Sequence, residues 1–116
     1  MTITRFVPGS RMTQVSVHGS TAYPCGQIAD RRPSSVTDQA KQIFEKIDKY
    51  LEMAGSSKSK MLSVQVWLSD IRFYDEFNAA WDGWVDQANT PGRACCEATL
   101  ASPDMLVELT VTASTD

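Results

Sequence analysis

LVELTVTA, residues 106–113, alternates between two kinds of side chain. Val107 and every second residue after it are apolar, whereas Glu108 and the two residues that follow it at the same spacing are polar. Successive side chains of a β-strand point to opposite faces of the sheet, so this pattern predicts a strand with one buried face. Other elements must then cover that apolar face.

Four further stretches have the composition of strands. Residues 14–18 and 21–25 flank Gly19-Ser20, which is suited to a tight hairpin turn. Residues 61–68 alternate again, and residues 93–100 follow a Pro-Gly turn. The side chains expected on the buried face of 61–68 are Leu62, Val64, Val66 and Leu68.

Two stretches repeat apolar residues at helical spacing. Ser35 is placed to cap the first helix, with Asp38 at its third position, and Gly55 is placed to end it in a left-handed conformation. A second helix is predicted from about Tyr74 to Val85. Its aromatic side chains lie on one side, which predicts core packing.

This order of elements predicts an α+β fold, in which two helices pack on one face of a mixed β-sheet. A chain of 116 residues, 42% of them hydrophobic, is expected to form a single domain over residues 1–116. We expect the other sheet face to carry polar side chains, including Arg93, Cys95 and Glu108. Such a face suits a subunit interface that contains a ligand pocket.

Composition argues against several classes of function. A net charge of -3 without a basic stripe argues against a nucleic-acid partner. The sequence has no apolar run long enough for a signal peptide or a membrane helix, so we expect a cytoplasmic protein that does not bind membranes. Three cysteines without a C-x-x-C pair and a single histidine argue against a metal site.

Arg93 and Glu108 are the two charged side chains with the clearest possible chemistry. The planar guanidinium of Arg93 could hold a carboxylate through two parallel hydrogen bonds, or it could be a solvated strand residue. Glu108 interrupts a β-rich tail and could be a general base if partly buried, or an exposed strand residue.

Three other residues have a functional and a structural interpretation. Cys95 has no histidine nearby in the sequence, which favours a ligand contact or packing over a nucleophile. Gly26 could bring its backbone close to a ligand, or could only turn the chain. Asn78 could orient part of a pocket, or could face water.

The stretch PGRACCEATLASPDMLVEL, residues 91–109, resembles a characteristic stretch of the RidA/YjgF family, with Arg93 and Glu108 at the same separation of fifteen residues. CGQ at residues 25–27 is similar to the S-G-Q of the family, and FNAAW at residues 77–81 is similar to a motif on its second helix. The resemblance covers nearly the whole chain.

The resemblance implies a chorismate-mutase-like fold and a homotrimer, with ligand sites between neighbouring subunits and no cofactor. It also implies an enzyme, a deaminase of the 2-iminobutanoate/2-iminopropanoate type, which hydrolyses short 2-imino acids and their enamines to 2-oxo acids and ammonia. The small-molecule ligand would therefore be an imino or 2-oxo acid.

Roles transfer only to matching positions. Arg93 matches the arginine that binds the substrate carboxylate, Glu108 the acid that positions water, Cys95 a pocket cysteine and Gly26 a glycine whose backbone contacts ligand. The chain departs from better-characterised members at two positions of the pocket wall: it has Met12 in place of a tyrosine and Cys25 in place of a serine.

Two alternatives remain at this point. A trimer that binds or senses a 2-oxo or amino acid would keep the arginine without turnover. An RNA-cleaving activity, a label also attached to the family, is disfavoured by the acidic charge balance.

Overall fold

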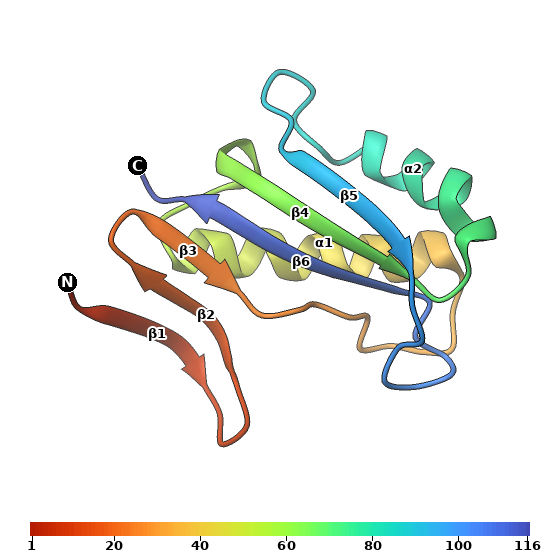
Figure 1. Cartoon of the computed structure of the whole chain (residues 1–116), viewed down its shortest axis with the longest axis horizontal. Coiled ribbons are helices and arrows are strands. Elements are labelled where there is room, and N and C mark those ends of the chain that lie inside the picture. Colours follow the sequence, from red (N-terminus) through yellow and green to blue (C-terminus); the bar gives the residue numbers. More distant parts are fainter.

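A computed structural model describes all residues from 1 to 116 (Figure 1). Its strands are β1 (Ile3–Pro8), β2 (Thr13–His18), β3 (Thr21–Pro24), β4 (Met61–Leu68), β5 (Gly92–Glu97) and β6 (Val107–Ser114). Its α-helices are α1 (Val36–Met53) and α2 (Tyr74–Asp82), and short 3-10 turns lie at Lys58–Lys60 and Ile71–Phe73. The first strand, β1, was not anticipated from the sequence.

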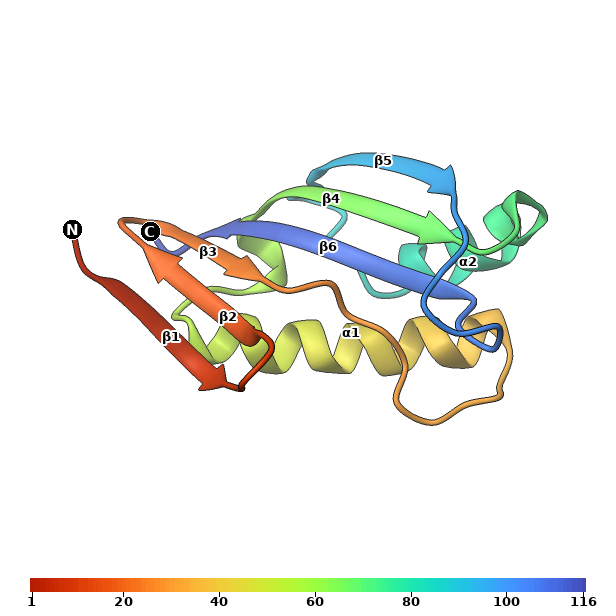
Figure 2. The same cartoon turned by 60° about the horizontal axis from the view of Figure 1, so that its bottom comes forward.

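The strands form one six-stranded sheet in the order β1-β2-β3-β6-β4-β5. Only β4 and β5 are parallel, and the other neighbouring strands are antiparallel. Both helices lie on the same side of this sheet, with α1 running along the strands and α2 near its β5 edge (Figures 1 and 2). The predicted α+β arrangement, a mixed sheet with two helices on one face, is confirmed.

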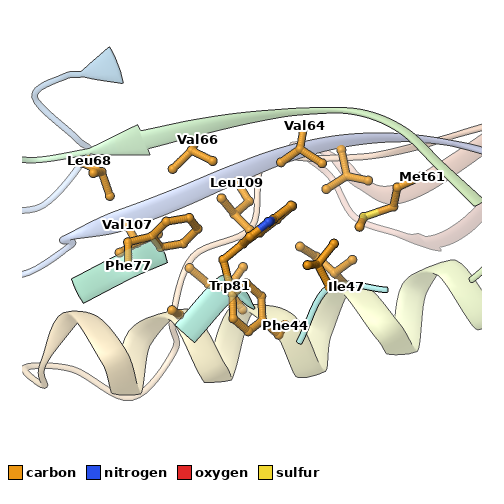
Figure 3. Packing of buried hydrophobic residues seen from close by; sticks show 14 of the residues in the cluster. Phe44, Ile47, Met61, Val64, Val66, Leu68, Phe77, Trp81, Val107 and Leu109 are labelled. Carbon is orange, nitrogen blue, oxygen red and sulfur yellow. The ribbon is translucent and has the colours of Figure 1, made fainter. Parts of the chain in front are cut away.

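The main core lies between the helices and strands β4 and β6 (Figure 3). Val107, Leu109 and the next two alternate residues of β6 are buried, as the alternation predicted. In β4, however, the pairing with β6 shifts between Met61 and Ser63. This irregularity turns Met61 into the core and leaves Leu62 54% exposed, so the prediction that Leu62 is buried was wrong.

The predicted ends of α1 are confirmed. The Ser35 hydroxyl accepts a hydrogen bond from the Asp38 backbone N–H at 3.0 Å, which satisfies one of the free donors of the first turn. Gly55 has a φ of +81°, and the backbone N–H of the next residue, Ser56, donates to Leu51 O at 2.8 Å. The second helix, α2, ends at Asp82, before the predicted Val85.

The side chains of strand β5 point to the opposite faces of the sheet from those predicted. It is in parallel register with β4, with Arg93 beside Val64 and Cys95 beside Val66. Both valines are buried against the helices, so Arg93 and Cys95 point to the helix side of the sheet and not to its open face. The strand also ends at Glu97, earlier than the predicted Leu100.

The cause lies at the edge of the sheet. Strand β5 is an edge strand, and its alternate residues Ala94 and Cys96 are small and exposed. The guanidinium of Arg93 instead lies over aromatic rings of α2. Packing against α2 therefore decides which side chains of this strand face the helices. The weak apolar alternation of its sequence does not decide it.

A buried glutamine ties the start of α1 to the turn before β6. Gln39 is fully buried, and its amide makes three hydrogen bonds. Its nitrogen donates to Ser34 O at 3.1 Å and to Asp104 O at 2.9 Å, while its oxygen accepts from Leu106 N at 2.9 Å. This network holds the chain in place immediately before Val107 enters the core.

Gln39→Leu is expected to lower the free energy of unfolding by about 3 kcal/mol, because it leaves three partly buried backbone groups without their partner, and a fully buried group left so costs about 1–3 kcal/mol. Urea denaturation measures this change. Gln87→Leu is the control, since Gln87 is exposed and a surface change is expected to alter stability by less than about 0.5 kcal/mol. Equal stability of the two variants would contradict the structural role of Gln39.

Candidate functional site

The four predicted site residues form two clusters on opposite faces of the sheet. Gly26 and Glu108 meet on the open face and are called the Glu108 cluster. Arg93 and Cys95 lie on the helix side and are called the Arg93 cluster. The structure therefore brings the four residues together in pairs. Within one chain it does not bring Arg93 and Glu108 to the same face.

The position of Glu108 follows from the register of β6. Glu108 pairs with Trp67 of β4, one residue away from the buried Val107 and Leu109 on either side. Because side chains alternate along a strand, its carboxylate points away from the helices. The side chain is half-buried there.

A single antiparallel β-bridge between Gln27 and Leu109, the residues that follow Gly26 and Glu108, holds Gly26 beside Glu108. Gln27 N donates to Leu109 O at 2.8 Å, and Leu109 N donates to Gln27 O at 3.1 Å. The bridge brings Gly26 so close to Glu108 that a Cβ at this glycine would overlap the carboxylate oxygen Oε2. A side chain at position 26 would therefore displace the Glu108 carboxylate from its place beside the backbone.

Burial raises the pKa of the Glu108 carboxyl above its ordinary value. No ion pair of the chain involves Glu108, so no cation offsets this effect. A carboxylate with a raised pKa is a stronger base than an exposed one. The Glu108 cluster can accept a proton from a water molecule.

Two glutamines that the sequence analysis missed lie beside this cluster. The Gln27 side-chain nitrogen donates to Gln14 Oε1 at 3.2 Å and to Cys25 O at 3.1 Å. The Cys25 thiol also donates to Gln14 Oε1, at 3.4 Å. Burial raises the pKa of this thiol, which keeps it protonated. The CGQ stretch contained a signal for Gln27, whereas nothing in the sequence indicated Gln14.

The guanidinium of Arg93 is held by side chains of α2. Its Nη2 donates to Asn78 Oδ1 at 2.7 Å and, at a long 3.5 Å, to the Tyr74 hydroxyl. The guanidinium carbon lies 5.2 Å from the ring centroid of Trp81 and 5.8 Å from that of Phe77. No carboxylate of the chain forms an ion pair with Arg93. Its charge can therefore attract an anionic ligand.

Cys95 lies two residues from Arg93 on the same face, half-buried against the core. Burial raises the pKa of its thiol, and this outweighs the lowering effect of nearby Arg93. A protonated thiol is a poor nucleophile, which favours the contact or packing role. Of the two side chains that hydrogen-bond to Arg93, the sequence analysis named Asn78 as a possible pocket residue but missed Tyr74.

Other parts of the molecule contribute little to these clusters. A groove of about 550 Å³ between α1 and α2 contains none of the four predicted residues. Groups of three or more His, Cys, Asp or Glu side chains that could hold a metal ion are absent. Neither helix has the length and apolarity needed to cross a membrane.

Comparison with known proteins gives consistent matches over the whole chain. The family model described as Endoribonuclease L-PSP matches residues 2–115. A RutC family protein of Haemophilus influenzae is 40% identical over 115 residues, covering 98% of this chain and 99% of that protein. The RutC family protein YoaB of Escherichia coli K12 is 32% identical over 114 residues, with coverage of 98% and 99%.

Solved structures agree. A YjgF family member from Neisseria meningitidis superposes with a TM-score of 0.97 at 31% identity, covering 100% of this chain and 97% of that one. An uncharacterized protein from Pseudomonas aeruginosa gives a TM-score of 0.96 at 36% identity, with coverage of 99% and 100%. In class, the molecule is thus an α+β protein with a mixed sheet covered on one face. The chain belongs to the RidA/YjgF family.

The raised pKa of Glu108 predicts a dependence of stability on pH. For a carboxyl whose folded-state pKa exceeds its unfolded value, the contribution to stability is fully present below the unfolded pKa and is lost as pH rises through the folded pKa. Glu108→Gln cannot ionise. The free energy of unfolding of this variant relative to wild type should therefore increase as pH rises above 4.5, the ordinary pKa of the carboxyl.

Denaturation at a series of pH values measures this difference, at one protein concentration throughout. Carbon NMR of the Glu108 carboxyl gives the midpoint of its titration directly, and this midpoint is expected above pH 4.5. A midpoint at or below that value would contradict the burial effect.

Proposed function

We propose that this protein hydrolyses short 2-imino acids, and the enamines in equilibrium with them, to 2-oxo acids and ammonia. The observation that carries the proposal is a pair of complementary groups: Arg93, which no carboxylate of the chain neutralises, and Glu108, whose pKa is raised. A carboxylate-binding cation and a base are the two groups that water addition to a 2-imino acid needs.

The opposite faces of Arg93 and Glu108 support a site shared between two subunits. One ligand can contact both side chains only if they come from different chains. A contact that joins two different faces is heterologous, and when its rotation divides a full turn evenly it closes into a ring. We propose the homotrimer with a chorismate-mutase-like fold that the family resemblance implies, with one site at each interface.

In the proposed mechanism, the substrate carboxylate docks on the guanidinium of Arg93, and this fixes the neighbouring imine carbon. Glu108 accepts a proton from a water molecule while the water oxygen bonds to that carbon and the C=N bond becomes a C–N bond. The proton passes to nitrogen, and the resulting carbinolamine loses ammonia to form the 2-oxo acid. Free imino acids already hydrolyse in water, so the site needs to supply only moderate acceleration.

Cys95 and Gly26 have supporting roles in this proposal. Cys95 contacts the ligand beside Arg93 as a neutral thiol. Gly26 leaves space for the Glu108 carboxylate and presents its backbone to the ligand. No metal or cofactor takes part.

The second candidate function is binding of a 2-oxo or amino acid without turnover. The observation that favours it is Met12, which lies between β1 and β2 and is 51% exposed. A methionine there offers no hydroxyl, whereas the corresponding tyrosine of better-characterised members would. An imine assay separates the two functions, because only the deaminase accelerates loss of the imine.

Arg93 and Glu108 variants are expected to differ. Arg93→Ala should abolish both 2-oxo acid binding and hydrolysis, and Arg93→Lys should recover little because an ammonium lacks the planar fork. Glu108→Gln should still bind, but its hydrolysis should fall by about 10²–10⁴-fold through loss of the base. A coupled threonine dehydratase assay follows the imine, and calorimetry measures affinity for a 2-oxo acid.

Arg72→Ala is the control for these variants, because Arg72 is exposed and its ion pair is with Asp70, which belongs to neither cluster. It should keep both binding and hydrolysis. Normal turnover by Glu108→Gln, or normal binding by Arg93→Ala, would show that the proposed roles are wrong.

Mixing the two inactive variants tests whether the site is shared. If one chain supplies Arg93 and its neighbour supplies Glu108, trimers assembled from equal amounts of Arg93→Ala and Glu108→Gln should regain about a quarter of the wild-type sites. The mixture must be unfolded and refolded together so that subunits exchange. Light scattering should report three chains per particle. No recovery of activity in verified mixed trimers would contradict a shared site.

A further inference from the structure

The Arg93 guanidinium has one close polar partner, and that partner is neutral. Asn78 Oδ1 accepts from Nη2 at 2.7 Å, while the Tyr74 hydroxyl lies at 3.5 Å. The guanidinium also lies over three aromatic rings of α2, those of Tyr74, Phe77 and Trp81. An arginine has five N–H donors, so a single amide oxygen leaves most of them free.

Acidic side chains are available on the same helix but do not hold Arg93. Asp75 and Glu76 lie in the first turn of α2. The Glu76 carboxylate instead accepts from the backbone N–H and the hydroxyl of Thr37, at 3.0 and 2.9 Å. A carboxylate at position 78 would form an ion pair with Arg93 and compete with any anionic ligand. An amide makes the same hydrogen bond without cancelling the charge.

We propose that Asn78 is a positioning residue, whose neutral amide fixes the guanidinium of Arg93 while leaving its positive charge for a ligand carboxylate. The inference rests on the proposed function only in taking a carboxylate as the ligand of Arg93. It adds a requirement of its own. Both the shape and the neutrality of the side chain at position 78 matter for affinity.

The carboxylate introduced by Asn78→Asp has nearly the same shape as the amide it replaces, so this variant changes the charge while keeping an acceptor for Arg93. Asn78→Ala removes the acceptor. Asn89→Asp and Asn89→Ala are matched controls, because Asn89 is exposed and donates to the Asp86 carboxylate outside the Arg93 cluster. The first control adds the same negative charge to the chain as Asn78→Asp.

Two measurements are made on the intact protein and its variants. Nitrogen NMR of the Arg93 guanidinium reports its order, and calorimetry with 2-oxobutanoate reports affinity. Asn78→Asp should keep Arg93 ordered yet bind the ligand at least about tenfold more weakly, through competition for the charge. Asn78→Ala should bind more weakly and also lose the order of Arg93. The Asn89 variants should match wild type in both measurements.

Kinetics add a further readout. In Asn78→Asp, the KM for the imine should rise while kcat at saturation changes little, because the variant weakens docking and leaves Glu108 intact. Wild-type affinity in Asn78→Asp would overturn the inference, since a merely structural asparagine tolerates the change. An unchanged Arg93 signal in Asn78→Ala would overturn it as well.

The same series separates this inference from the proposed function. A wild-type protein that binds 2-oxobutanoate but does not hydrolyse imines contradicts the deaminase proposal, and the affinities of the Asn78 variants still decide the role of Asn78. A wild type that binds no 2-oxo acid overturns both.

Discussion

The burial of one face of β4 and β6 against the two helices is the constraint on which the rest of the structure depends. Side chains of a strand alternate with a period of two, so a slip of one residue would move the whole apolar set to the open face. Burial of Val107 and Leu109 therefore forces Glu108 outward. The register of β5 on β4 places Arg93 beside buried Val64 and turns it toward α2.

Both charged residues are kept beside neutral neighbours. Arg93 has the amide of Asn78 and a set of aromatic rings around it, and Glu108 has a glycine at its carboxylate. An internal ion pair at either position would neutralise the charge and occupy the hydrogen-bonding positions that a ligand would use. The half-buried positions of the two side chains limit the cost of leaving them unpaired, because part of each stays hydrated. Under the proposed function, this arrangement leaves both groups available to a ligand.

The separation of the two clusters links the fold to the proposed assembly. A sheet with helices on one face has an open face that no element of the same chain covers (Figure 2). Glu108 lies on that open face, while Arg93, on the edge strand β5, points to the opposite face, where the helices lie. Under the proposed function, assembly both covers the open face and completes the site. Stability and activity would then depend on the same interface.

The sequence by itself determined the features that depend on local pattern. The alternation of β6, the Ser35 cap and the left-handed Gly55 were all predicted, because each depends on residues close together in the chain. The four candidate site residues were named from the sequence with the help of the family resemblance, and their roles stay predictions. Only the tertiary structure decided the irregularity at Met61, the contact between Gly26 and Glu108, and the face on which Arg93 lies. Each of these depends on what a distant segment packs against, which local alternation does not contain.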